Sequence, residues 1–252
     1  MTPEQHFQAI LRVGDDALVL GQRLSEWCGH GPVLEEDIAL TNIALDLIGQ
    51  ARGAYTRAGS LEGKGRDEDQ LAYFRTDREF QNVLLVERPN GHFGDTIVRQ
   101  MLFDAFSLAR LEWLAQQTVD LELAAVAAKA VKEVRYHWSH SSQWVVRLGD
   151  GTDESHAKVQ QSLEDLWPFT GELFTSDDVD RAAAAAGLFP VLEDLHAPWV
   201  DRVKAVLDEA GLNTPENGWM QRGGKQGIHS EHLGYMLAEM QVLPRTYPDA
   251  TW

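Results

Sequence analysis

Residues 34–55, LEEDIALTNIALDLIGQARGAY, constrain the fold more than any other stretch of the chain. The segment contains no proline and is long enough for about six helical turns. Apolar or small side chains recur along it in two rows: Leu34, Ile38, Leu45 and Ile48, and then Leu40, Ala44, Leu47 and Ala51. Because two such rows cover most of a helix circumference, we expect other helices to surround this one.

A third row on the segment is polar or small and consists of Asn42, Asp46, Gly49, Gln50 and Gly53. Carboxylates are rarely buried without a partner, because removing a charge from water costs free energy. The row therefore indicates either a buried polar network or the close approach of a second helix.

The rest of the chain repeats the helical spacing. Long helices are expected at residues 3–28, 96–117 and 121–148, and shorter ones at 67–74, 78–87, 153–167, 176–186, 189–210 and 230–243. Thr2 and Pro3 are typical of a helix start, Asp95 is the expected cap at 96, and Pro198 predicts a bend. No stretch alternates as strands do. We therefore predict one all-α domain over residues 1–252, with four long helices and additional peripheral ones.

Charge and composition exclude several classes of function. The net charge of −17 argues against a nucleic-acid binder, because phosphate contacts need clustered lysine and arginine. No apolar run approaches the roughly 18 residues of a membrane span, and we expect no secretion signal. The single cysteine, Cys28, excludes an internal disulfide and a cysteine metal cluster. These features suit a cytoplasmic protein, in which we expect Cys28 to be a small core residue.

Four long helices invite comparison with di-iron centres, in which two helices each supply a Glu and two others each a Glu-x-x-His. Glu193 and His196 form the one Glu-x-x-His of the chain, and Asp153 and His156 form an Asp-x-x-His. Both pairs fall in the first turn of a helix, where acids interact favourably with the helix dipole. We interpret both as solvated helix starts.

Polar residues nevertheless lie on the core side of all four long helices: Glu26, Asp46, Gln50, Asp104, Glu133 and His137. One helix alone, at residues 121–148, supplies histidine, and there the acid and the histidine are four residues apart, as Glu133-x-x-x-His137. On the helix at residues 34–55, Gln50 stands where a histidine ligand is wanted. We interpret the set as the polar interior of a di-iron site without its ligands. Two alternatives stay open: ion pairs to Arg12, Arg52, Arg99 or Arg135, and iron binding by these carboxylates with His137.

Other catalytic signatures are missing, including the Walker loop, the nucleophile elbow and the dinucleotide-binding fingerprint. The GGKQG stretch at residues 223–227 follows no strand, and we expect a flexible turn there. His229 and His232, three residues apart, are expected at the surface, where they begin the helix at 230–243.

Six strings occur in order along the chain: LSEWCGHGP (24–32), ALDLIGQAR (44–52), LLVERPNGHFGDTI (84–97), KEVRYH (132–137), RLGDGTDES (147–155) and GGKQGIHSEHLGYMLAEMQ (223–241). Together they resemble the family of C subunits of bacterial phenylacetyl-CoA epoxidases, the ring-1,2-epoxidases or phenylacetate-CoA oxygenase complexes. The resemblance runs from about residue 10 to residue 252.

The resemblance implies a ferritin-like four-helix bundle that does not perform the chemistry itself. In that family a related A subunit holds the di-iron centre and binds the CoA thioester, and a reductase subunit delivers electrons from NADPH. The C subunit pairs with the A subunit and is a structural component that has lost its iron ligands. No catalytic residue, metal or cofactor is therefore expected in this chain. Its expected partners are the other epoxidase subunits, above all the di-iron catalytic A subunit.

The assembly is expected to be a homodimer or a hetero-oligomer. Tyr235, Met236 and Met240 are candidates for the interface, because aromatic and methionine side chains are enriched in interfaces. The competing hypotheses are a di-iron oxygenase in its own right and a ferritin-like storage or binding protein.

Overall fold

The computed structural model describes residues 1–248 and 250, and every regular element in these residues is a helix. Four are long: α1 (Pro3–Ser25), α2 (Leu34–Glu62), α4 (Phe93–Gln117) and α5 (Leu121–Gly149). The prediction of an all-α protein is confirmed for the described residues. None of these helices is both long and apolar enough to cross a membrane.

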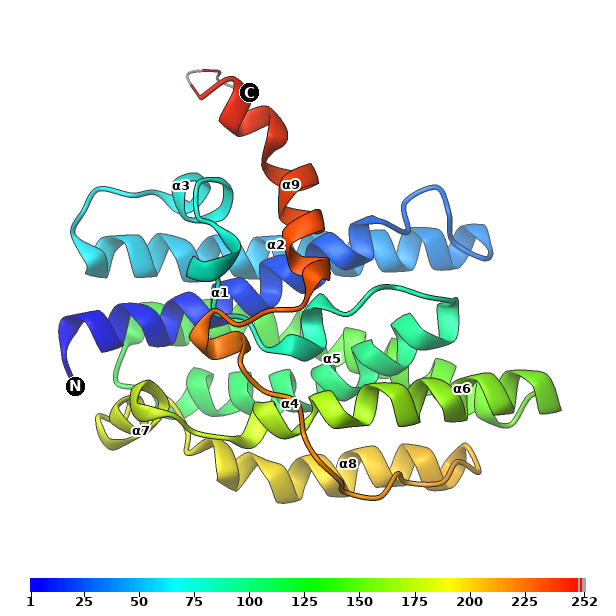
Figure 1. Ribbon diagram of the computed structural model, residues 1–252. Helices are drawn as coiled ribbons and strands as arrows, with labels where there is room; N and C mark the ends of the chain where they lie inside the picture. The colour runs from blue at the N-terminus through cyan, green and yellow to red at the C-terminus, as the bar shows by residue number, and fades with distance from the viewer. Residues whose placement is uncertain (249, 251–252) are drawn as a thin grey trace.

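The long helices form two antiparallel hairpins, α1 with α2 and α4 with α5, which lie against each other (Figure 1). Shorter helices are added around them: α3 (Glu68–Tyr73), α6 (Asp153–Leu166), α7 (Asp178–Ala185), α8 (His196–Glu209) and α9 (Glu231–Thr246). Helices α6 and α8 pack on the second hairpin, and α9 projects from the side of the first (Figure 1).

Local sequence explains most helix boundaries. Thr2 caps α1 with a capping box, and Pro3 occupies the first position, where no backbone N–H is needed. The cap of α4 is His92, one turn before the predicted helix start. Pro198 lies in the first turn of α8, which follows the short 3₁₀ helix η5 (Leu192–Leu195), so the predicted bend in one long helix is wrong.

Helix α1 ends at Ser25, three residues earlier than predicted. The chain then turns through Gly29, whose φ of +80° favours glycine. Cys28 lies in this turn and is exposed, so its prediction as a core residue is wrong.

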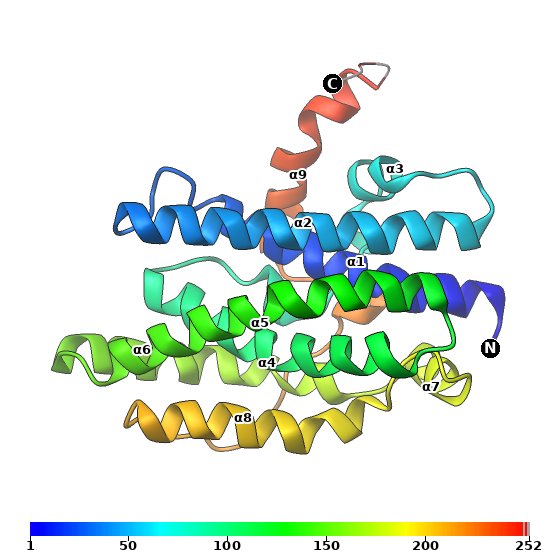
Figure 2. The ribbon, with the colours of Figure 1, turned by 180° about the vertical axis from the view of Figure 1, so that it is seen from behind.

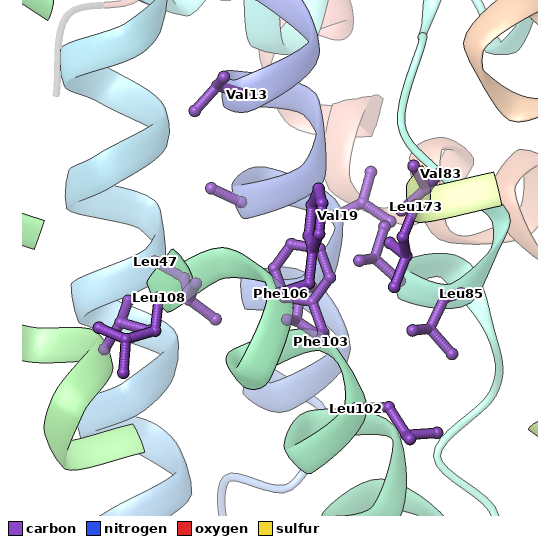
Figure 3. Packing of buried hydrophobic residues seen from close by; sticks show 14 of the residues in the cluster. Val13, Val19, Leu47, Val83, Leu85, Leu102, Phe103, Phe106, Leu108 and Leu173 are labelled. Carbon is purple, nitrogen blue, oxygen red and sulfur yellow. The ribbon is translucent and has the colours of Figure 1, made fainter. Parts of the chain in front are cut away.

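The apolar core draws on every α-helix, and Figure 3 shows Val19, Leu47 and Phe106 of α1, α2 and α4 within it. On α2, the row of Leu40, Ala44, Leu47 and Ala51 is buried as predicted. The other row faces outward, with exposed fractions of 72% for Leu34, 52% for Ile38 and 61% for Leu45. The prediction that other helices surround this segment is therefore wrong: one apolar face of α2 is uncovered.

Asp15 and Asp16 of α1 are buried beside each other and organise the connection between the hairpins. Asp15 accepts from Tyr55 Oη at 2.7 Å and from Gln81 N at 2.7 Å, and it is paired with Arg75. Asp16 accepts from Val83 N at 2.9 Å and from Arg110 at 3.0 Å.

These bonds hold residues 81–83 in extended conformation. In place of the predicted helix at 78–87, the chain forms two short 3₁₀ helices, η1 (Asp77–Glu79) and η2 (Leu84–Glu87). The physical reason is that the backbone N–H groups of Gln81 and Val83 donate to side-chain carboxylates instead of to the carbonyl four residues earlier.

Two glycines of α2 test how closely this helix packs against the segment that follows it. A methyl group on Gly59 would collide with the backbone oxygen of Arg66, whereas one on Gly49 would meet open space. We expect Gly59→Ala to lower the free energy of unfolding by about 1–3 kcal/mol through overpacking. Gly49→Ala, the control, should raise it by about 0.5–1 kcal/mol through helix propensity. Urea unfolding measures both, and equal effects of the two substitutions would contradict the packing described.

Candidate functional site

A row of polar side chains lies between α2, α4 and α5. At its centre His137 of α5 is buried and its Nε2 lies 3.1 Å from Asp46 Oδ2 of α2. Burial lowers the pKa of His137, and the bond to Asp46 opposes that shift. The second ring nitrogen, Nδ1, is buried with no hydrogen-bond partner in the part of the chain described. His137 is therefore oriented by one carboxylate alone.

One turn further along α5, Ser141 contacts Asp104 of α4. Ser141 Oγ donates to one carboxyl oxygen at 2.9 Å, and Gln100 Nε2 lies 2.7 Å from the other. Burial raises the pKa of Asp104 to about 8, and these neutral hydrogen-bonding partners offset only part of the rise. The protonated form of this buried carboxyl group is consequently favoured at neutral pH.

Two further pairs join α2 to α5 on either side of His137. His140 Nε2 lies 2.7 Å from Glu36 Oε2, and Gln50 Nε2 donates to Glu133 Oε2 at 3.0 Å. Lys129 is also within 3.5 Å of Glu133. These bonds join α2 to α5, although His140 Nδ1, like His137 Nδ1, is buried without a hydrogen-bond partner among the described residues.

Glu26 does not belong to this row. It follows the last residue of α1, its side chain is 39% exposed, and it binds Arg23 at 2.7 Å and Asn90 at 2.9 Å. The prediction that it leans into the interior is wrong, because α1 ends before it. Helix α1 supplies Asp15 and Asp16 instead, which the sequence analysis missed although they interrupt an apolar run.

The alternative of ion pairs to four arginines is wrong as well, because each arginine has other partners. Arg12 binds Asp177 and Asp180, Arg52 binds Glu68, and Arg135 binds Glu112. Arg99 donates to the backbone oxygen of Arg88 and to Asn90 Oδ1.

The remaining candidates serve local packing. Glu193 accepts from the backbone and hydroxyl of Ser176, and His156 Nδ1 lies 2.7 Å from the carbonyl of Gly149. His229, predicted at the surface, is buried between Glu87 and the carbonyl of Phe80. That prediction is therefore wrong.

The expected flexible turn at residues 223–227 is a packed one. It contains the 3₁₀ helix η6 (Gly224–Gln226), and its Lys225 is buried 2.7 Å from Asp180. Lys225 also donates to the carbonyl of Thr175 at 2.8 Å. The turn is thus fixed to α7 and to the end of η4 (Gly171–Phe174).

The carboxylates of the polar row do not converge on a common point. Within residues 1–248 and 250, no three His, Cys, Asp or Glu side chains gather as the ligands of a metal ion would. Asp46, Asp104 and Glu133 each face a histidine, hydroxyl or amide partner instead of a common point.

Fold and site together define an all-α protein built on two helical hairpins, with a partly buried row of hydrogen-bonded polar groups between three of its long helices. The chain belongs to the family of phenylacetic acid catabolic proteins, whose model matches residues 1–252. It is 51% identical over 242 residues to the C subunit of the 1,2-phenylacetyl-CoA epoxidase of Escherichia coli strain K12. That alignment covers 96% of this chain and 97% of the relative, so the resemblance seen in the motifs is confirmed.

Because the pKa of Asp104 is raised in the folded chain, the free energy of unfolding should depend on pH. The folded chain keeps a proton that the unfolded chain releases near its ordinary pKa of 3.8, so this group destabilises the fold as pH rises from about 4 to about 8. The substitution Asp104→Asn removes that loss. Its stability relative to the unmodified chain should increase with pH by up to about 1.4 kcal/mol per unit. Urea unfolding from about pH 5 to about pH 8 measures the difference. A difference independent of pH would show that Asp104 is ionised.

Proposed function

We propose that this chain is the non-catalytic C subunit of a cytoplasmic phenylacetyl-CoA epoxidase. In this role it forms a ferritin-like bundle that pairs with, and stabilises, the di-iron subunit that performs the oxygenation. Support comes from the similarity to the C subunit of such an epoxidase along nearly the whole chain. The observation that carries the non-catalytic role is the self-pairing of the polar row between α2, α4 and α5.

The chemistry of that row explains why it is unsuited to iron. A carboxylate-bridged pair of irons needs ionised carboxylates and imidazole nitrogens that converge from all four helices. In this chain Asp104 is engaged by Ser141 and Gln100, Gln50 presents an amide, and His137 is bound to Asp46. Hydrogen bonds between these side chains therefore join the helices.

The uncovered face of α2 and α5 is the surface best suited to a partner protein. Leu34, Ile38 and Leu45 of α2 are exposed there, and Tyr136 of α5 is 51% exposed. Figure 2 shows α2 and the first half of α5 turned toward the viewer without another helix in front of them. Rows of exposed apolar side chains are typical of protein interfaces, because their contact with water is unfavourable.

A groove continues this face between the two helices. It has a volume of about 490 Å³ and includes Gly49 and Gly53 of α2 and Ala125 and Val126 of α5. Small side chains let another helix approach closely, and the apolar row beside them supplies buried area. We infer that a helix of the di-iron subunit packs along α2.

Helix α9, which the sequence analysis favoured as the interface, is a weaker candidate. Met236 is buried and Met240 is half-buried against the body of the molecule, so these two side chains stabilise the fold of this chain. Tyr235 is exposed and can serve as a control.

Iron content separates the proposed role from the two alternatives. After anaerobic loading of the isolated chain with Fe(II) and desalting, we expect essentially no retained iron, because the carboxylates of the polar row already have other partners and do not converge. About two irons per chain would make the protein a di-iron catalyst in its own right. A large iron-filled shell, visible as a high molecular mass in solution, would make it a storage protein.

Substitution of the exposed row tests the partner. We expect the double variant Ile38→Asp, Leu45→Asp to lose co-purification with the co-expressed di-iron subunit, because two buried charges weaken binding by about 2 kcal/mol or more. Its circular dichroism should be unchanged, since both side chains are exposed in the isolated chain. The matched control Tyr235→Asp on α9 should co-purify normally. Loss of the complex in the control alone would place the interface on α9.

A further inference from the structure

A second groove lies between α3 and the second half of α9, where α9 leaves the body of the molecule beside α3 (Figure 1). Its volume is about 980 Å³, which is at the upper limit of small-molecule sites and large enough for several side chains of a peptide segment. The residues that line it are distinct from those of the polar row and of the groove between α2 and α5.

Hydrogen bonds between the two helices hold the walls of this groove in place. Gln241 of α9 is buried, and its Nε2 donates to the carbonyls of Ala72 at 3.1 Å and Arg75 at 3.0 Å. One turn later, Arg245 donates to the carbonyls of Tyr73 at 3.0 Å and Arg75 at 2.9 Å. Side chains of α9 thus bind carbonyl groups that the end of α3 leaves without a helical donor. The groove is therefore formed before a partner arrives, and binding does not have to order its walls.

The groove exposes apolar side chains from both helices. Phe74, which follows α3, is 44% exposed, and Leu243 and Tyr247 of α9 are 55% and 58% exposed. Tyr73 and Met240 are half-buried beside them. Aromatic and methionine side chains are enriched at protein interfaces, and apolar side chains gathered in one hollow are unfavourable in water. The groove therefore has the apolar character of a docking surface.

The rim of the groove is acidic. Asp67 and Asp69 lie at the start of α3 and Glu239 lies on α9, and all three are exposed. Among the described residues, Asp69 and Glu239 form neither an ion pair nor a side-chain hydrogen bond. The lining cation, Arg66, is already engaged by Glu62, with 2.7 Å between Nε and Oε2. The rim thus keeps a negative charge that nothing in the described chain neutralises.

This charge decides between the possible occupants. A second copy of the chain would bring the same carboxylates and a net charge of −17, so like charges would oppose the contact. An anionic membrane surface is repelled for the same reason. A helix with apolar side chains on one face and lysine or arginine beside them matches both the floor and the rim, as in other complexes in which an amphipathic helix lies in a groove.

We propose that the α3–α9 groove binds a basic amphipathic helix of a partner protein. Its apolar face packs on Phe74, Leu243 and Tyr247, and its basic side chains pair with Asp69 and Glu239. This surface is separate from the α2–α5 face to which the di-iron subunit is assigned, so one chain can hold two partners at once. The inference does not depend on the proposed subunit role.

Methionine methyl signals in an NMR spectrum of the full chain, labelled with ¹³C at these methyl groups, report the binding directly. The probe is a synthetic amphipathic helix of about 14 residues, with leucine on one face and lysine on the other. The signal of Met240, which lines the groove, should shift. The signal of Met220, which is half-buried beside α8, should stay in place. Single Met→Leu variants assign the two signals. Absence of a shift at Met240 at millimolar probe, or an equal shift at Met220, would overturn the proposal.

Variants and a matched probe test the rim and the floor separately. The double variant Asp69→Asn, Glu239→Gln should raise the dissociation constant about three- to tenfold, as expected for two exposed charge pairs. The control Asp208→Asn, Glu209→Gln removes the same charge from exposed positions of α8 and should leave binding nearly unchanged. Leu243→Asp should weaken binding about tenfold or more, because it places a charge against the apolar face. A probe with glutamate in place of lysine should not shift Met240. Equal binding of the two probes, or equal effects of the two double variants, would contradict the assignment.

The molecular mass of the isolated chain in solution tests the competing occupant. Sedimentation should give the same mass for the unmodified chain and for Leu243→Asp, because the acidic rims of two copies repel each other. A dimer that Leu243→Asp dissociates would assign the groove to a second copy of the chain and would overturn the proposal.

Discussion

Two adjacent buried carboxylates, Asp15 and Asp16, join the two hairpins and the connection between them. Each would be strongly unfavourable inside the protein without partners, so each has a cation and a backbone N–H within hydrogen-bonding distance. Arg75 comes from the connection between the hairpins and Arg110 from α4. Because both pairs start from one turn of α1, they attach the connection and the second hairpin to the same point of the first.

The two hairpins are covered by different elements. The connection between α2 and α4, together with α3 and α9, lies on one side of the first hairpin, while α6 and α8 cover the second hairpin (Figure 1). No element of the described chain returns to cover the outer face of α2. An apolar row that would be unfavourable in a free protein is left exposed there, which supports a role as part of a larger assembly.

The polar row joins the long helices through directional hydrogen bonds. Asp46 with His137, and Gln50 with Glu133, pair across α2 and α5, and the protonated Asp104 avoids the cost of a buried charge. These bonds specify which residues of the helices face one another. Apolar contacts alone would fix that register less strictly, because they are not directional.

The helices, several of their caps and the family could be predicted from the residues alone, because these depend on the order of neighbouring residues. Thr2 and Pro3 set the start of α1, and the spacing of Asp104, Glu133 and His137 already indicated a polar interior lacking a di-iron ligand pattern. Contacts between distant parts of the chain settled which row of α2 is covered, that Glu26 lies outside the interior, and that Asp104 is buried, which raises its pKa. A helical pattern defines faces but not their neighbours, and burial, pairing and pKa depend on residues distant in the chain that folding brings together.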